Sequence, residues 1–223
     1  MSLYKDRGFL ASVGAGLLLL VASIGAVFYS TNYAGISASN SVTDIVLSNT
    51  RVYEVDGLFI YGALALVAFI SLLIVLRPAY LPFTLKGIAL FYFVRSISVS
   101  LTHISPFPER VVLDASPYFV SSQFFRVFFT GDDLFFSGHV GLPFLLALIF
   151  WDNRGLRYLF LALSVMFAVV VLLGHLHYSI DVFAAYFITY AVYVLARRLF
   201  NSDFLRIAAC PERSRGAHAA PVK

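Results

Sequence analysis

The chain has 223 residues, of which 60% are hydrophobic and 13% are Asp, Glu, Lys or Arg. Soluble domains carry about 25% charged residues, so this composition excludes an ordinary soluble domain. It also excludes a disordered chain, which needs low hydrophobicity and high charge. With a formal net charge of only +4 and no nucleic-acid-binding signature, we predict an all-α polytopic membrane protein that does not bind nucleic acid.

Six stretches are apolar enough to cross a bilayer as helices, which takes about 20 residues each. In chain order they cover residues 9–29, 57–76, 81–104, 134–151, 156–174 and 178–199. The first is about twice as long as the apolar part of a signal peptide, so we expect a retained helix. We predict one six-helix transmembrane domain over residues 1–200 and a disordered cytoplasmic tail over residues 201–223.

The basic residues are spread unevenly between the two ends of these spans. Of the 16 Lys and Arg residues, 12 lie in the termini and in the second and fourth connections, 3 lie on the opposite side, and Arg95 lies within a span. Both termini are therefore predicted to be cytoplasmic, which agrees with an even number of spans. The Pro- and Phe-rich connection 105–133 falls on the outer side and is expected to lie on the membrane surface, partly as helix.

A first polar motif leads into the fourth span as Ser137-Gly138-His139, preceded by Asp133. Ser137 and Gly138 are typical of a helix start, with Ser137 as the N-cap. Backbone N–H groups at a helix start bind phosphate, and Gly138 lets a ligand approach the backbone closely. His139 would then stand beside a bound anion. A capped helix with an interfacial histidine is the alternative that these residues leave open.

A second polar motif opens the sixth span, where His177 and Asp181 are spaced i,i+4. On a helix they share a face and can hydrogen-bond. A carboxylate on Nδ1–H would fix the imidazole tautomer and leave Nε2 as a nucleophile or base. An interfacial ion pair without catalysis is the alternative. His175 points elsewhere on such a helix, and we interpret it as a polar interface residue.

Arg95 is the basic residue within a span, about nine residues or 13 Å from the predicted outer end. Its guanidinium is expected to reach an outer-leaflet phosphate by snorkelling, and a bundle-stabilising pair with Asp181 is the alternative. Metal chemistry is a weaker hypothesis, because the histidine spacing does not fit a His-Glu-x-x-His pattern. We therefore predict no metal and no cofactor.

The two motifs resemble those of the type 2 phosphatidic acid phosphatase superfamily, and more closely its sphingomyelin synthase branch. Residues 137–139 are similar to the superfamily's Ser-Gly-His motif, and residues 177–181 are similar to its His-x-x-x-Asp motif. The strings at 177–182 and 185–189 resemble the synthases' His-Tyr-Thr-x-Asp-Val and Ala-Tyr-x-Ile-Thr. The lipid phosphatases have an Arg six residues before the second His, where this chain has Val171. Since the synthases also lack that Arg, its absence favours group transfer.

The resemblance implies a phosphotransferase or phospholipase C on the non-cytoplasmic leaflet, facing the periplasm in a bacterial inner membrane. His177, oriented by Asp181, would attack the headgroup phosphodiester of a glycerophospholipid, and His139 would protonate the diacylglycerol that leaves. The phospho-headgroup would pass to a ceramide-like hydroxyl or to water. The alternatives are a lipid phosphate phosphatase and a non-catalytic lipid-binding or transport protein.

The remaining site residues are expected to bind the substrate. Arg95 and the backbone of Ser137 and Gly138 would stabilise the phosphoryl oxygens. Asp133, together with aromatic faces such as Tyr178, would hold a choline or ethanolamine headgroup.

Overall fold

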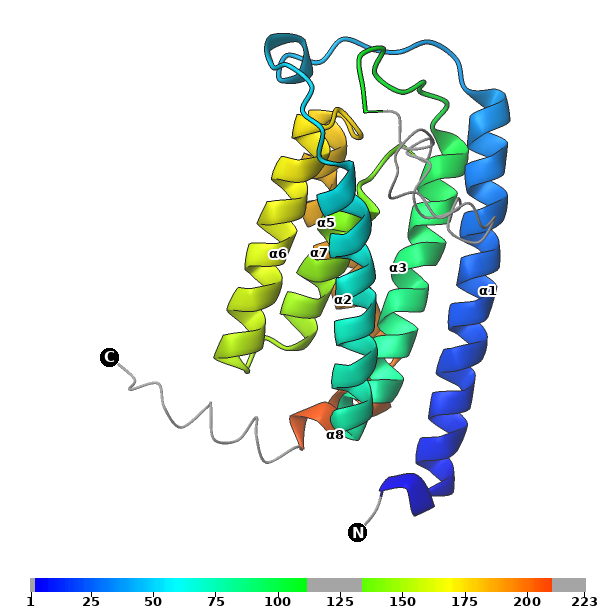
Figure 1. Cartoon of the computed structure of the whole chain (residues 1–223). Coiled ribbons are helices and arrows are strands. Elements are labelled where there is room, and N and C mark those ends of the chain that lie inside the picture. Colours follow the sequence, from blue (N-terminus) through cyan, green and yellow to red (C-terminus); the bar gives the residue numbers. More distant parts are fainter. Residues whose placement is uncertain (1–2, 112–133, 210–223) are drawn as a thin grey trace.

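The computed structural model describes residues 3–111 and 134–209, and all regular structure in this part of the chain is helical. The predicted all-α class is therefore confirmed. The described helices are α1 (Arg7–Ser37), α2 (Asp56–Leu76), α3 (Leu81–Leu101), α5 (Gly138–Ile149), α6 (Arg154–Leu173), α7 (Ser179–Leu199) and α8 (Asn201–Ala208), with short 3-10 helices at Leu3–Lys5, Leu47–Asn49 and Pro78–Tyr80. The longer helices stand side by side as a bundle, and α8 lies at one end of it (Figure 1).

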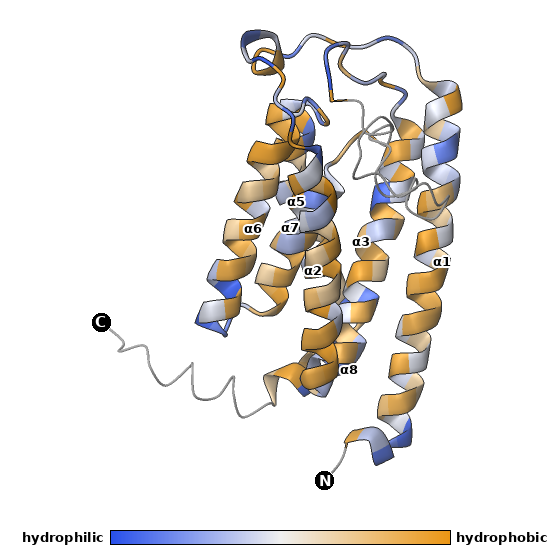
Figure 2. Ribbon diagram, in the orientation of Figure 1, coloured by the Kyte–Doolittle hydropathy of each residue, from blue (hydrophilic) through white to orange (hydrophobic). Residues whose placement is uncertain are grey.

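Five of the described helices, α1, α2, α3, α6 and α7, are long and apolar enough to cross a membrane. Their outer faces carry mostly hydrophobic residues (Figure 2). On α1, Leu18 and Ile36 are 74% and 88% exposed, which suits contact with lipid chains rather than water. The chain is thus an integral membrane protein, while the side of the membrane that each end faces stays a prediction.

The fourth predicted span, 134–151, is wrong at its start. The helix found there, α5, has 12 residues, and at about 1.5 Å per residue it is about 18 Å long. Residues 134–137 do not join the helix because their backbone bonds to other elements. The Phe136 carbonyl accepts from Arg95 Nε at 3.0 Å, and the Ser137 N–H donates to the Asp181 carbonyl at 3.2 Å.

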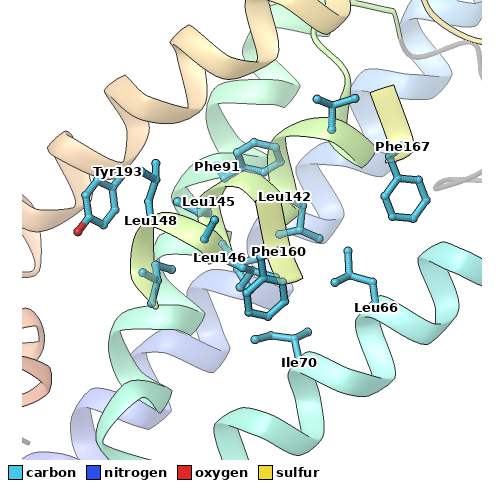
Figure 3. Close-up of a cluster of buried hydrophobic side chains, with 14 of the residues drawn as sticks. Leu66, Ile70, Phe91, Leu142, Leu145, Leu146, Leu148, Phe160, Phe167 and Tyr193 are labelled. Carbon is cyan, nitrogen blue, oxygen red and sulfur yellow. The ribbon is translucent and has the colours of Figure 1, made fainter. Parts of the chain in front are cut away.

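The short helix α5 is enclosed by the rest of the bundle, and nine of its residues are buried. Figure 3 shows its leucines packed among aromatic and aliphatic side chains of α2, α3, α6 and α7. A Cβ on Gly141 would lie 2.7 Å from Thr189 Oγ1 and 2.8 Å from a Phe91 ring carbon. Glycine is therefore required for α5 to approach α3 and α7 this closely.

The first and last described segments meet at one end of the bundle, where Arg206 and Asp6 form an ion pair of 3.1 Å. The structure differs here from the predicted disordered tail, because residues 201–208 form α8. Two features hold this helix in place. Phe204 and Ile207 are buried, and Asp203 accepts hydrogen bonds from Lys86 Nζ and Ser12 Oγ, both at 2.7 Å. Residues 210–223 lie outside the described part.

The buried Lys86–Asp203 pair is expected to stabilise the whole bundle. Asp203→Ala leaves the Lys86 ammonium, only 12% exposed, without its carboxylate partner, which costs about 3 kcal/mol of unfolding free energy. Thermal unfolding in detergent, followed by circular dichroism, measures this loss. Arg206→Ala removes the exposed pair at the same end, keeps the Asp6 N-cap of α1, and should cost much less. Equal losses in the two variants would contradict the role assigned to Lys86.

Candidate functional site

His177 and Asp181 lie where α7 begins, and the structure brings them together as predicted. Asp181 Oδ2 lies 3.3 Å from His177 Nδ1 and accepts the Tyr178 backbone N–H at 3.1 Å. His177 and Asp181 are both buried. The carboxylate also lies in the first turn of α7, where the helix dipole favours a negative charge. With its Nδ1 proton donated to Asp181, His177 would present the lone pair of Nε2, a tautomer that we assign from this contact.

The two polar motifs are parts of one site. The Ser137 N–H donates to the Asp181 backbone carbonyl at 3.2 Å, which ties the start of α5 to the start of α7. Arg95 reaches the same place from α3. It is buried, and its Nε lies 2.9 Å from where a Cβ on Gly138 would stand. Glycine is thus required at position 138 for the guanidinium to lie against the turn, and whether Arg95 also reaches a lipid phosphate stays a prediction.

Two polar atoms in this site lack a hydrogen-bond partner among the described residues. They are Ser137 Oγ and Asp181 Oδ1, and both side chains are almost fully buried. Ser137 holds the N-cap position of α5, as predicted, although its hydroxyl makes no capping bond. A buried polar atom without a partner costs about 1–3 kcal/mol, so each calls for an explanation, and a ligand that supplies the missing bond is one.

His139, in the first turn of α5, is held between two other helices. Its ring centroid lies 4.1 Å from that of Phe59 on α2 and 5.8 Å from that of Phe167 on α6. Both contacts are tilted, at 38° and 52°, and together they restrict the orientation of the imidazole, because aromatic pairs have preferred geometries. The sequence did not point to Phe59, because it lies in a uniformly apolar stretch.

Asp44 lies in the connection between α1 and α2 and forms hydrogen bonds with the first residue of α7. Its Oδ2 accepts from the Ser179 backbone N–H at 2.7 Å and from the Ser179 hydroxyl at 2.8 Å. Its Oδ1 accepts from the backbone N–H groups of Val46 and Leu47. Burial raises the pKa of this carboxyl, but the four hydrogen bonds outweigh burial and hold the pKa below its ordinary value of 3.8.

Tyr178 also joins α7 to the connections at this end of the bundle. Its hydroxyl donates to the Ser105 carbonyl at 2.8 Å and accepts from the Val42 N–H at 3.2 Å. Burial raises the pKa of this phenol. These bonds give Tyr178 a positioning role that its prediction as a headgroup ligand did not include.

His175 lies outside the contact between His177 and Asp181. Its Nδ1 lies 2.7 Å from the Glu109 carbonyl and its Nε2 lies 3.2 Å from Thr50 Oγ1. Both ring nitrogens therefore contact the connections at this end of the bundle, as we expect for a polar interface residue.

Asp133, the predicted headgroup ligand, lies outside the described residues, as does most of the 105–133 connection. Among the residues that the structure describes, no group of three or more His, Cys, Asp or Glu side chains could hold a metal ion.

The comparison with protein families addresses the segment that carries both motifs. Residues 131–198 match the family model described as PAP2 superfamily C-terminal. This match includes His139, His177 and Asp181, and it supports the type 2 phosphatidic acid phosphatase superfamily and a lipid phosphatase-type enzyme. It does not distinguish the sphingomyelin synthase branch. The searches of curated proteins and of solved structures returned no match.

From the hydrogen bonds of Asp44, we predict that its contribution to the stability of the fold depends on pH. Since the pKa of Asp44 is lower in the folded chain, its contribution is fully present above about pH 4 and is lost as the pH falls through the folded value. Asp44→Asn should lower unfolding free energy by about 2 kcal/mol at pH 7. In thermal unfolding, the difference in stability between Asp44→Asn and the wild type should disappear below pH 3.8. Glu54→Gln, an exposed acid of the same connection, serves as the control, and an equal effect there would refute the assignment.

Proposed function

We propose that this protein cleaves the headgroup phosphodiester of a glycerophospholipid through a phosphohistidine and passes the phospho-headgroup to a lipid hydroxyl or to water. The observation that carries the proposal is the His177–Asp181 contact of 3.3 Å, tied by the Ser137 N–H to the turn that Arg95 contacts. A nucleophile, a group that orients it, and a cation with backbone donors are what phosphoryl transfer requires.

The first step forms a phosphorus–nitrogen bond. His177 Nε2 attacks the phosphorus while Asp181 holds the proton on Nδ1 and balances the imidazolium charge. The bond between phosphorus and the diacylglycerol oxygen breaks, and protonated His139 gives its proton to that oxygen. The products are diacylglycerol and a headgroup phosphate attached to His177.

The second step reverses these roles. The hydroxyl of a ceramide-like acceptor, or water, attacks the phosphorus while His139, now neutral, takes its proton. The phosphorus–nitrogen bond breaks and His177 is restored. With a lipid acceptor the reaction is a transfer, and with water it is that of a phospholipase C.

The charge available at the site favours a diester over a monoester. A phosphodiester carries one negative charge, which the Arg95 guanidinium, the one that the described residues bring to this turn, can offset through its planar set of donors. A phosphate monoester carries nearly two charges at neutral pH and calls for more cations. Where the related lipid phosphatases have an arginine, Val171 is fully buried in the apolar core. Hydrolysis of a lipid phosphate monoester is the second candidate, because the PAP2 match supports a phosphatase-type reaction.

A lipid assay with purified protein tests the proposal. Phosphatidylcholine or phosphatidylethanolamine is supplied in detergent with and without ceramide. We expect diacylglycerol in both cases and a new phosphosphingolipid with ceramide. His177→Ala should lower the rate by at least about 10³-fold and Asp181→Asn by about 10²–10⁴-fold. His103→Ala, whose ring packs on Tyr33 away from these contacts, is the matched control.

Three outcomes would overturn parts of this proposal. Release of inorganic phosphate from phosphatidic acid, without cleavage of either diester, would establish the monoesterase instead. Lipid binding without turnover of any of these lipids would favour a binding or transport protein. Full activity in His177→Ala would remove it as the nucleophile.

The role of His139 as an acid predicts that a better leaving group makes it dispensable. With phosphatidylcholine, His139→Ala should slow the first step by about 10²–10⁴-fold. With p-nitrophenyl phosphorylcholine, whose leaving group needs no proton, the defect should shrink to about tenfold or less. The burst of p-nitrophenol measures this first step. His177→Ala should stay inactive on both substrates, and an equal defect of His139→Ala on both would argue against acid catalysis.

A further inference from the structure

An open groove lies at the end of the bundle opposite the histidine motifs, where α7 meets α8. Its volume is about 540 Å³, within the range of small-molecule sites. Two arginines, one amide and three apolar side chains contribute to it. The lining residues are Val194, Arg197, Arg198, Asn201, Phe204 and Leu205.

Among the described residues, no carboxylate pairs with the two arginines of the groove. The Arg197 guanidinium lies over the rings of Phe204 and Tyr193, with its carbon 4.4 and 5.7 Å from their centroids. Within the described residues, neither Arg197 nor Arg198 forms a hydrogen bond or an ion pair. No acidic side chain of the described residues lines the groove, and the buried Asp203 of α8 is already bound to Lys86.

The position of the groove places it at the level of lipid headgroups. It opens at the last turns of α7, one of the helices long and apolar enough to cross a membrane. Leu195 and Leu199, in the same turns of α7, are 42% and 59% exposed, and Leu205 in the groove is 56% exposed. An occupant therefore meets cationic donors and, beside them, apolar surface that suits an acyl chain.

We propose that this groove binds an anionic phospholipid, independently of the reaction at the opposite end. Two guanidinium groups can each bind phosphate oxygens through paired N–H donors, and Asn201 adds an amide. A basic residue near an anionic membrane surface is worth about a fivefold gain in affinity, and a zwitterionic lipid does not supply the matching net charge. The chemical class is thus a phospholipid with a net negative headgroup.

Native mass spectrometry of the full-length protein in detergent tests this binding. Phosphatidylglycerol and phosphatidylcholine with the same acyl chains are titrated separately. We expect the wild type to retain phosphatidylglycerol about tenfold better than phosphatidylcholine. Arg197→Ala with Arg198→Ala should remove most of this preference while leaving phosphatidylcholine binding unchanged.

The matched control is Arg154→Ala with Arg157→Ala. It removes the same charge at the same end of the bundle, at the start of α6 and away from the groove, and should keep the preference. Because Arg197 packs on α8, Arg198→Glu is the second variant if the double variant unfolds, and it too should lose the preference. Equal retention of both lipids by the wild type, or equal losses in the groove and control variants, would overturn the proposal.

Discussion

The backbone that enters α5 must find its hydrogen bonds within the protein, and the site depends on this constraint. Among apolar helices, no water is at hand for the polar groups of an irregular turn. Arg95 from α3 takes the Phe136 carbonyl, and the Asp181 carbonyl of α7 takes the Ser137 N–H. The same two contacts that satisfy this turn bring the arginine and the histidine–carboxylate pair beside it. The stability of the turn and the geometry of the site therefore share one set of bonds.

Short sequence motifs were enough to predict those contacts of the site that lie within one helical turn. The i,i+4 spacing of His177 and Asp181 was enough to predict their contact, and the Ser-Gly-His string located the start of α5 to within a residue. The partners Asp44 and Phe59 could not be predicted, because each contacts residues 80 or more positions away along the chain. The sequence did not predict helix α8. Its apolar face covers two turns only, and the ion pair that holds it joins Asp203 to Lys86, which is distant along the chain.

Charged side chains lie at both ends of α7. One end holds His177 and Asp181 beneath the connections that Asp44 and Tyr178 fasten, and the other end holds the two arginines above α8. Between them, α7 packs through Ala185, Thr189 and Ala196 against its neighbours. Small residues allow the close approach of helices that a rigid site needs. The His177–Asp181 pair and the arginine groove, on one helix, can therefore each keep its shape without contact between them.

The ion pair between Lys86 and Asp203 also orders events during synthesis. The two residues are 117 positions apart, so at about 5–20 residues per second the lysine waits roughly ten seconds for its partner. Throughout that time α3 carries a charge that no carboxylate of α8 offsets. The ammonium must stay near the headgroups until α7 has crossed and α8 has folded back. This end of the bundle can therefore close only after α8 has been synthesised.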